Sequence, residues 1–321
     1  MIIPTSSTYR PTLKDFKAAS KRIESIAHRT SLIPLRWYEE NPEILLKPEM
    51  LQPIGSYKIR GVYNWVAKLS PEQRAKGIST ASSGNMAQAV AYVGKLFNIP
   101  ARTIIFDTSP QTKKDAILKY GGELVTKSWN DWIEYTINPD DDRCFIHPLE
   151  EFGLMDGHGT IGLEIMEDAP ETETIYVPMG AGLLGAGVSL AAKSLKPSVK
   201  IIGVNAENSP HYFESLKHGR VMDTPPKPTL SDGTAGNLSS FPNFDNSLKL
   251  VKETIDKVVL VSEEQMKDAI RYLALENKLI AEGAGAMSLA AALETPMEER
   301  GKTVCILTGG NIDADKLTKI L

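Results

Sequence analysis

The chain has 321 residues, of which 42% are hydrophobic and 24% are charged, and its formal net charge at pH 7 is −4. This length allows two hydrophobic cores, and the slightly acidic balance gives no basic surface for a nucleic-acid backbone, so we expect an enzyme-sized globular protein without a nucleic-acid partner. The first residues lack a basic segment followed by an apolar core, and no apolar run approaches the roughly 20 residues of a membrane helix, so we expect a cytoplasmic protein that binds no membrane.

Short β-branched segments alternate with longer helical segments after a first helix that begins near Thr12 and has Asp15 in a capping position. The predicted strand and helix pairs are 77–81 with 86–97, 103–106 with 112–120, 174–178 with 184–195, 199–204 with 210–218, 258–261 with 263–274, and 304–307 with 314–321. This alternation predicts an α/β fold with mainly parallel sheets, in which ligands bind at the carboxyl ends of the strands. The segment 224–245, rich in Pro, Ser, Gly and Asn, is predicted to be a long loop in the wall of the site.

The run Gly55-Ser56-Tyr57-Lys58 places a lysine between a glycine turn and a helical segment at 59–69. A lysine held there can reach into a cleft, where burial favours the neutral amine that forms Schiff bases. The simpler alternative is a solvated surface lysine at a helix start.

The run Ser82-Ser83-Gly84-Asn85 links a predicted strand to a predicted helix. Hydroxyls and backbone N–H groups at a helix N-terminus can hold a carboxylate, such as that of an amino acid. An ordinary helix cap explains the same residues.

The glycine-rich run from Gly180 to Gly187 follows the strand at 174–178 and predicts a loop that holds a phosphate through its backbone N–H groups. The run also contains the G-x-G-x-x-G pattern of dinucleotide-binding folds, and Glu207 lies about twenty residues further on, where those folds place the acid that binds the ribose. Close packing of a helix on a strand is a third explanation for the glycines.

The run Thr308-Gly309-Gly310-Asn311 follows the last predicted strand. The threonine hydroxyl can hydrogen-bond a neutral ring nitrogen, and the glycines allow close approach of a ligand. By itself, the run is also compatible with a simple turn.

Together and in this order, the four loops resemble those of the fold-type II pyridoxal-phosphate enzymes, specifically the serine/threonine dehydratase and serine racemase family. The resemblance extends over nearly the whole chain and includes His28-Arg-Thr-Ser-Leu, Lys47-Pro-Glu, His147-Pro-Leu-Glu-Glu, Gly157-His-Gly-Thr, Asp232-Gly-Thr-Ala and Glu282-Gly-Ala-Gly-Ala. It implies a pyridoxal 5′-phosphate cofactor between two three-layer αβα lobes of the tryptophan synthase β-like fold. Residues 48–147 would form the smaller mobile lobe, residues 1–47 and 148–321 the larger cofactor-binding lobe, and the protein would be a homodimer.

The resemblance also implies roles for individual residues. Lys58 would bind the cofactor and shuttle the α-proton, and Tyr57 would lie beside the ring, where the family usually has Phe. Asn85 would bind the pyridoxal 3′-oxygen, Thr308 would meet the pyridine nitrogen, and Glu282 would belong to the cofactor site. The phosphate would be held by Gly180, Ala181, Gly182, Leu183 and Leu184. The substrate carboxylate would be held by Ser82, Ser83, Gly84, Asn85 and Met86.

A neutral hydroxyl such as that of Thr308 makes the cofactor a weaker electron sink than a carboxylate partner would, which suits elimination better than transamination. We therefore expect an ammonia-lyase that converts a β-hydroxy amino acid such as L-threonine or L-serine to a 2-oxo acid and ammonia. One alternative is an amino-acid (serine) racemase, in which Ser83 would be the second proton carrier. Another is a dehydratase specific for 3-hydroxyaspartate or phenylserine, because the pocket for the substrate side chain is built from loop positions such as 232–238.

Several positions depart from the family pattern. Leu183 replaces a glycine of the usual phosphate loop, and Met86 stands where many relatives have His. Asn205 stands where the metal-binding members have an acid, so we expect no strong divalent-cation site, with a shifted site at Glu207 and His211 as the alternative. We also expect no regulatory domain of the kind found in biosynthetic threonine dehydratases.

Overall fold

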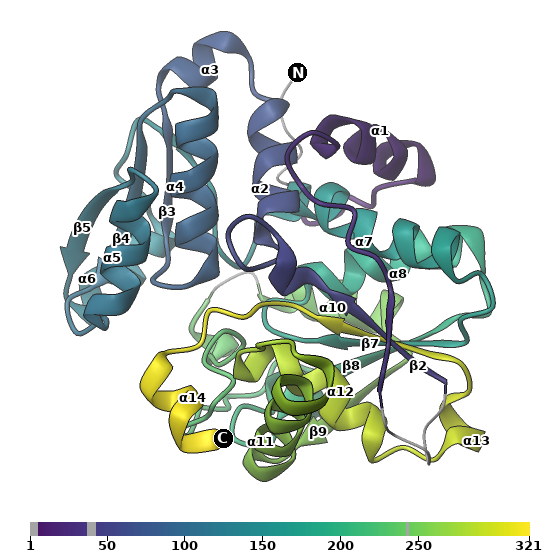
Figure 1. Cartoon of the computed structure of the whole chain (residues 1–321). Coiled ribbons are helices and arrows are strands. Elements are labelled where there is room, and N and C mark those ends of the chain that lie inside the picture. The colour runs from purple at the N-terminus through teal and green to yellow at the C-terminus, as the bar shows by residue number, and fades with distance from the viewer. Residues whose placement is uncertain (1–5, 37–42, 242–243) are drawn as a thin grey trace.

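Two β-sheets of different size organise the chain in this computed structural model, which describes residues 6–36, 43–241 and 244–321 (Figure 1). The larger sheet has the strand order β1-β2-β10-β7-β8-β9, in which only the β1–β2 pair is antiparallel. The smaller sheet has the order β5-β4-β3-β6 and is parallel throughout. The predicted α/β class with mainly parallel sheets is confirmed.

The last strand of the chain lies inside the larger sheet, between β2 and β7. The strands of this sheet are β1 (Ile33–Pro34), β2 (Ile44–Pro48), β7 (Thr174–Pro178), β8 (Lys200–Ala206), β9 (Lys257–Val261) and β10 (Thr303–Leu307). Those of the smaller sheet are β3 (Ile78–Ala81), β4 (Ala101–Phe106), β5 (Glu123–Lys127) and β6 (Cys144–Phe145). The smaller sheet is thus one continuous stretch of sequence, whereas the larger sheet combines strands from both ends of the chain.

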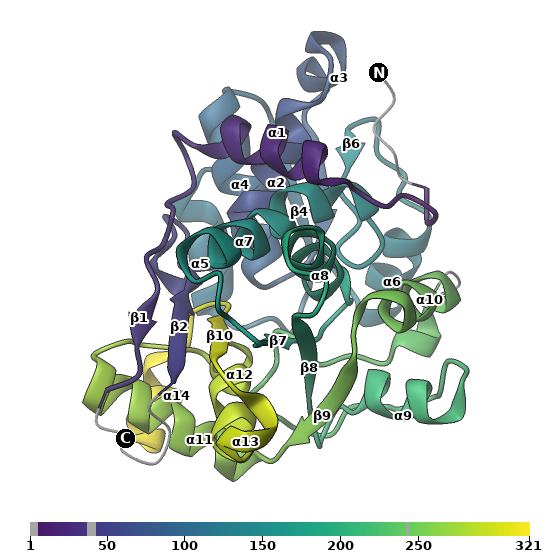
Figure 2. The ribbon, with the colours of Figure 1, turned by 90° about the vertical axis from the view of Figure 1, so that its right-hand side faces the viewer.

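Helices cover both faces of the larger sheet (Figure 2). Side chains alternate across a strand, so that Val304 and Ile306 of β10 face one helical layer and Cys305 and Leu307 face the other. The first layer consists of α7 (Met155–Asp168), α8 (Leu183–Leu195), α9 (His211–His218) and α10 (Phe244–Thr254). The second consists of α11 (Glu263–Tyr272) and α12 (Gly283–Leu293).

The smaller sheet is covered in the same way. Ile78 and Ile105 pack toward α2 (Lys58–Ala67), α4 (Asn85–Phe97) and α5 (Gln111–Lys119), whereas Ile104 packs toward α6 (Trp129–Ile137). The remaining elements are α1 (Leu13–Ile23), α3 (Pro71–Ala75), α13 (Met297–Arg300), α14 (Ala314–Ile320), the 3₁₀ turns η1 (Glu49–Leu51), η2 (Phe152–Leu154) and η3 (Leu238–Ser240), and the π-helical turn η4 (Leu273–Asn277).

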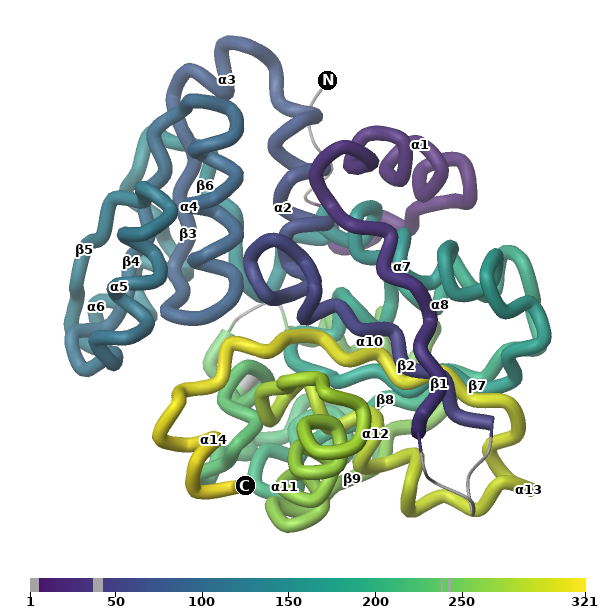
Figure 3. The backbone as a smooth tube through the Cα atoms, viewed as in Figure 1, coloured from purple at the N-terminus to yellow at the C-terminus, as the bar shows by residue number. Residues whose placement is uncertain are grey.

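Helix α2 contacts both parts of the molecule, because it packs on α4 of the smaller part and on α7 of the larger (Figure 3). Its contact with α7 is very close. A β-carbon at Gly157 would lie 2.2 Å from the carbonyl oxygen of Arg60, and one at Gly61 would lie 2.4 Å from Nε2 of His158. Glycine at these positions lets the two helices touch through their backbones.

Two predicted segments end differently in the structure. The helix predicted at 263–274 ends at Tyr272 and continues as the π-helical turn η4. The predicted loop 224–245 includes η3 and the start of α10 at Phe244, and its residues 242–243 lie outside the described residues.

At the first helix, Thr12 N donates to Asp15 Oδ2 at 2.8 Å, so the predicted start is confirmed. In the part of the chain that the structure describes, no helix is both long and apolar enough to span a membrane.

Candidate active site

The loop that carries Lys58 is paired with the loop that follows β10. Tyr57 N donates to the carbonyl oxygen of Thr308 at 3.1 Å, and Gly310 N donates to that of Gly55 at 3.0 Å. Gly55 has a φ of 71°, which allows the turn before the lysine. Lys58 is the first residue of α2, and its Nζ lies 5.0 Å from the centroid of the Tyr57 ring. The structure therefore brings the first and the fourth predicted loops together.

The second loop meets the fourth loop and the start of α12. Asn85 Nδ2 donates to Glu282 Oε1 at 2.7 Å, and Asn311 Nδ2 donates to Asn85 Oδ1 at 2.7 Å. A β-carbon at Gly309 would lie 2.5 Å from Glu282 Oε1 and 3.1 Å from Asn85 Nδ2, so these groups converge on one point. Because an amide nitrogen carries two hydrogens, Asn85 keeps one N–H for a ligand.

The N-terminus of α4 differs from an ordinary capped helix. Its N-cap residue is Gly84, which has no side chain, and among the described residues the Ser82 hydroxyl accepts a bond only from Gly84 N, at 3.3 Å. Elsewhere in the chain, Ser70, Ser128 and Ser262 cap α3, α6 and α11 through their side chains. The helix-cap interpretation of the serine loop is therefore wrong, and the first-turn amides of α4 have no side-chain cap. Met86 has a buried side chain, so only its amide faces this N-terminus.

The third loop is held from behind by two side chains of α9. His211 Nε2 lies 3.0 Å from the carbonyl oxygen of Gly180, and the Tyr212 hydroxyl donates to that of Ala181 at 2.9 Å. The C=O and N–H of a trans peptide point in opposite directions, so the N–H groups of Ala181 and Gly182 point away from these two side chains. Gly182 has a φ of 84° and leaves the N-terminus of α8 without a side-chain cap. This geometry fits a loop that binds an anion through its backbone.

Burial holds the pKa of His211 at about 4 and raises that of Tyr212 well above its usual value, so both side chains are neutral at pH 7.

Gly187 of the same glycine run has a packing role, because a β-carbon there would lie 2.8 Å from the carbonyl oxygen of Met155 on α7. The phosphate and packing interpretations of the glycine run therefore apply to different glycines.

The loop before η3, which is predicted to form a wall of the site, contacts the third loop and lies close to Glu282. A β-carbon at Gly180 would lie 3.5 Å from Cα of Thr234, and one at Gly233 would lie 3.9 Å from Glu282 Oε1. Asp232 pairs with Lys113 of α5 at 3.0 Å, which links this wall to the smaller sheet.

Glu282 is a buried carboxyl at the junction of these loops. Burial and the charge of Asp232 raise its pKa to about 7, against the opposing effects of the Asn85 hydrogen bond and of Lys113. The group therefore exchanges a proton near neutral pH, as acid–base groups in active sites do.

The sequence did not single out His158 as a site residue, although it lies beside the lysine loop. Its ring packs against that of Tyr57 with centroids 4.9 Å apart. Neither of its ring nitrogens, nor the buried Oγ of Ser56, has a hydrogen-bond partner among the described residues. Burial, together with the charges of Lys58 and Arg60, keeps the pKa of His158 well below its usual value. Unpaired buried polar atoms of this kind are typical of a site that receives a ligand or water.

Asn205 has a structural role. Its Nδ2 donates to the carbonyl oxygen of Met179 at 2.9 Å, and its Oδ1 accepts from the amides of Tyr212 and Phe213 at 3.1 Å each. Glu207 is exposed, and His211 is engaged at Gly180. Within residues 6–36, 43–241 and 244–321, no group of three or more His, Cys, Asp or Glu side chains is arranged to hold a metal ion. The absence of a cation site remains a prediction.

A cavity of about 440 Å³ lies elsewhere, between α1 and α7. It contains none of the predicted site residues, and its charged walls include Arg29 and Glu167, which pair with each other at 2.8 Å. We assign the site to the converging loops and not to this cavity. Unpaired polar groups that converge on one place are better evidence for ligand binding than the volume of a cavity.

The converging loops together offer a lysine amine, a buried threonine hydroxyl at the end of β10, and two helix N-termini whose amides have no side-chain cap. Such N-termini bind anions. The arrangement therefore fits a phosphorylated ring compound held at α8 and a carboxylate held at α4.

Comparisons with known proteins agree with this chemistry. The family described as "Pyridoxal-phosphate dependent enzyme" matches residues 23–309. The chain is 40% identical to an L-threonine ammonia-lyase of Thermotoga maritima over 317 residues, which cover 97% of this chain and 78% of that protein. Maize serine racemase has a similar structure, with a TM-score of 0.88, 30% identity and 97% of each chain covered. The processed form of threonine deaminase isoform 2 from Solanum lycopersicum has a TM-score of 0.86 and 29% identity, with 100% of this chain and 97% of that one covered.

Proposed function

This chain belongs to the family of pyridoxal-phosphate dependent enzymes, and on that premise we propose that it is an ammonia-lyase acting on L-threonine, L-serine or a related β-hydroxy amino acid. Its cofactor is pyridoxal 5′-phosphate, and its products are a 2-oxo acid and ammonia. The main evidence for this class of substrate is the 40% identity to an L-threonine ammonia-lyase over 97% of the chain. The dinucleotide interpretation of the glycine run has no support in these comparisons.

The bound cofactor supplies the electron sink for negative charge at the substrate α-carbon. We assign to Lys58 Nζ both the attachment of the cofactor and the transfer of the α-proton, because the lysine begins α2 in the loop that pairs with the Thr308 loop. Tyr57 would lie beside the cofactor ring. Its own ring is held against His158 at 4.9 Å, which limits its movement.

The phosphate would bind the amides of Ala181, Gly182, Leu183 and Leu184, next to Gly180. Two of these amides are directed by the bonds that His211 and Tyr212 make to the loop carbonyls. The side chains of Leu183 and Leu184 are buried, so the leucine that replaces the family glycine contributes its backbone to the loop. The side chain of Leu183 packs with Phe152, Met155 and Leu250, so we expect it to leave the backbone at this position open to the anion.

The ring of the cofactor would meet polar groups at both edges. The Thr308 hydroxyl would bind the neutral ring nitrogen, and the remaining N–H of Asn85 would bind the 3′-oxygen. Glu282 orients Asn85 through its 2.7 Å hydrogen bond, and burial raises its pKa to about 7. A neutral partner at the nitrogen favours elimination over transamination.

The substrate carboxylate would bind at the N-terminus of α4. The donors there are the hydroxyls of Ser82 and Ser83 and the amides from Gly84 to Met86, none of which serves as a side-chain cap of the helix. Binding at this point would hold the α-carbon between Lys58 and Ser83.

A racemase is the second candidate, because maize serine racemase is similar in structure and Ser83 is available as a second proton carrier. Specificity for 3-hydroxyaspartate or phenylserine would depend on the loop around Asp232 and Thr234, which lies next to Gly180.

We also propose that residues 48–147 form the smaller, mobile lobe, since they contain the whole four-stranded sheet. A homodimer in the cytoplasm is expected from the family resemblance. Sedimentation analysis tests the homodimer, and cell fractionation tests the cytoplasmic location.

The decisive test uses the purified protein with added pyridoxal phosphate and a panel of threonine, serine, 3-hydroxyaspartate and phenylserine. We expect a visible absorption band of the lysine-bound cofactor and release of a 2-oxo acid, highest for threonine or serine. Chiral analysis of the same mixtures, with Ser83→Ala as the control, measures racemization. A protein that shows no visible band with the cofactor, or whose Lys58→Ala variant releases 2-oxo acid at the unmodified rate, contradicts the proposal.

A further inference from the structure

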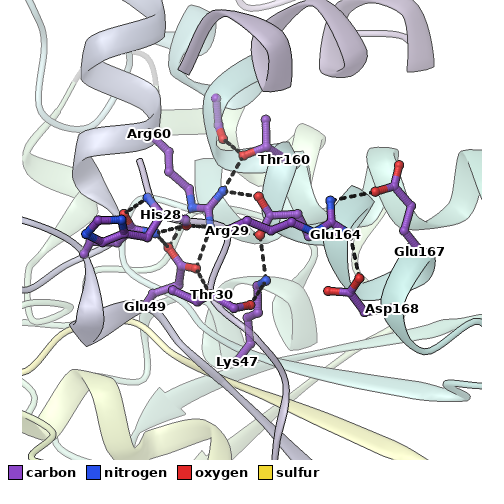
Figure 4. A network of polar contacts seen from close by, with 12 residues as sticks. His28, Arg29, Thr30, Lys47, Glu49, Arg60, Thr160, Glu164, Glu167 and Asp168 are labelled. Carbon is purple, nitrogen blue, oxygen red and sulfur yellow. Dashed lines mark hydrogen bonds and ion pairs between the residues drawn. The ribbon is translucent and has the colours of Figure 1, made fainter. Parts of the chain in front are cut away.

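A group of buried charged side chains lies where α2 meets α7, η1 and β2 (Figure 4). Its members are Lys47 of β2, Glu49 of η1, Arg60 of α2 and Glu164 of α7, and we call it the α2 network. Two positive and two negative charges balance within it. Although burial favours a protonated Glu49, the Arg60 guanidinium holds the pKa of that carboxyl below its usual value.

Arg60 is the centre of the α2 network. Its Nε and Nη2 donate to Glu49 at 2.7 and 2.8 Å, and its Nη1 and Nη2 donate to Glu164 at 2.6 and 3.0 Å. Further bonds reach the Thr160 hydroxyl at 3.0 Å and the carbonyl oxygen of His28 at 2.9 Å. A guanidinium has five N–H donors in one rigid plane, so these partners fix both its position and its orientation.

Lys47 completes the α2 network from the larger sheet. Its Nζ donates to Glu164 Oε2 and to the carbonyl oxygen of Thr30, each at 2.6 Å. Lys47 also pairs in register with Ile306 of β10, two residues before Thr308. The α2 network is thereby anchored on the strands that lead into the site.

Lys58 and Arg60 are two residues apart on one helix, so their side chains leave it about 200° apart. Arg60 lies in the α2 network, whereas Lys58 Nζ lies by the ring of Tyr57, the residue whose backbone N–H bonds Thr308. A guanidinium held in one plane therefore determines how α2 is turned about its own axis, and that turn determines where Lys58 points.

We propose that Arg60 is a positioning residue for Lys58, which ties the first turn of α2 to the larger sheet and sets the direction of the lysine. The inference rests on the proposed function. It gives α2 two attachments of different kind: apolar contacts that include α4, and fixed ionic contacts to Glu49 of η1 and Glu164 of α7. Although α2 belongs to the proposed lobe 48–147, these contacts would keep its lysine beside the phosphate loop and Thr308 if the four-stranded sheet moves.

Two variants test this role without leaving an unbalanced charge in the core. Arg60→Lys keeps the positive charge but loses the planar fork. The double variant Arg60→Met with Glu49→Gln removes one charge of each sign, so that Lys47 and Glu164 remain as a pair. Asp141→Asn is the stability control, because it removes the charge of a buried carboxylate that pairs with Arg143 (3.0 Å), next to the smaller sheet.

The holoenzymes are compared by visible absorption, visible circular dichroism of the bound cofactor, kcat and KM, at a temperature where each is fully folded. We expect kcat to fall about 10- to 100-fold in both Arg60 variants, with KM changed less than about threefold. We also expect a weaker visible dichroism band, because that band depends on cofactor orientation. Arg60→Lys should retain more of both signals than the double variant, and Asp141→Asn should keep them at wild-type values.

Wild-type dichroism and kcat in both folded Arg60 variants would overturn the inference and leave the α2 network with a purely structural role. A wild-type protein without any visible band would overturn the proposed function, and this inference with it. The two failures are thus distinguished by the wild-type spectrum.

Discussion

Two cationic side chains near the start of α2 have opposite environments, although they are only two residues apart. Arg60 is fully buried, and bonds from all of its nitrogens reach acceptors. Lys58 Nζ contacts the Tyr57 ring at 5.0 Å and has no hydrogen bond or ion pair within the described ranges. In α2, the side chain whose nitrogens are all paired holds the scaffold, and the side chain whose amine is unpaired belongs to the candidate site. The predictions below test this division.

The largest expected effect is on activity at Lys58. Lys58→Ala should lower 2-oxo acid release by at least about ten-thousandfold, because it removes the attachment point and the proton carrier together. Its free energy of unfolding should change by less than about 1 kcal/mol, since no ion pair is lost. Activity assays and urea denaturation measure the two quantities. A large loss of stability in this variant would contradict the division.

The reverse pattern is expected at Arg60. Arg60→Met alone leaves two buried carboxylates with Lys47 as their cation, and should lower the free energy of unfolding by about 3–5 kcal/mol. Urea denaturation of the cofactor-free protein measures this loss. The double variant with Glu49→Gln should recover part of it, and a double variant that is less stable than the single one would contradict the ionic explanation.

Stability should depend on pH through His211, which bonds the carbonyl oxygen of Gly180 in the phosphate loop. Its pKa is lowered from 6.5 to about 4 in the folded protein, so its contribution to stability is complete above pH 6.5 and is lost as the pH falls through 4. His211→Gln removes this ionisation, and its stability should therefore fall less between pH 6.5 and 4, by up to about 3 kcal/mol. Identical pH profiles for the two proteins would show that His211 is not buried as a neutral group.

A smaller effect, on stability and on cofactor affinity, is expected at Tyr212, a buried side chain of α9 that bonds the phosphate loop. Tyr212→Phe loses the 2.9 Å bond to the Ala181 carbonyl, which should cost about 1 kcal/mol and weaken cofactor affinity about fivefold. Titration of the cofactor-free protein with pyridoxal phosphate measures the affinity. Tyr92→Phe in the smaller part is the matched control and should bind the cofactor as tightly as the unmodified protein.

The smallest effect is expected at Arg29. Its guanidinium pairs with Glu167 at 2.8 Å and with Asp168 at 2.6 Å on α7, one turn beyond Glu164, but these side chains are partly exposed. Arg29→Ala should therefore lower the free energy of unfolding by less than about 1 kcal/mol. A loss as large as that of Arg60→Met would mean that burial does not distinguish the two arginines.

The sequence predicted the strands whose short apolar runs are bounded by turn residues, including the fully buried β3, β7 and β10. Alternation of strands and helices was visible at β3, β4, β7, β8, β9 and β10 and in the helices that follow them. Helices α7 and α12 were not predicted, because α7 contains three glycines and α12 is buried almost all round. A helix without a polar face has no hydrophobic periodicity to detect.

Within the candidate site, the loops were recognisable because glycines and hydroxyls follow strands directly. The partners behind them were not. Arg60 and Glu164 are 104 residues apart in sequence, and His211 is 31 residues from Gly180, so no local spacing links them. The Lys47-Pro-Glu run did carry a signal, because two charged residues stand at the end of an otherwise apolar strand, but their partners depend on tertiary structure.

The position of β10 also bears on how the protein is made. During synthesis, residues 78–145 can assemble their sheet as soon as they emerge, since its strands are contiguous in sequence. The central strand of the other sheet, and the threonine that follows it, emerge more than 150 residues later. Until then the nascent chain exposes the flanks of β2 and β7 and cannot retain its vitamin-derived cofactor, so chaperone dependence should be concentrated in that interval.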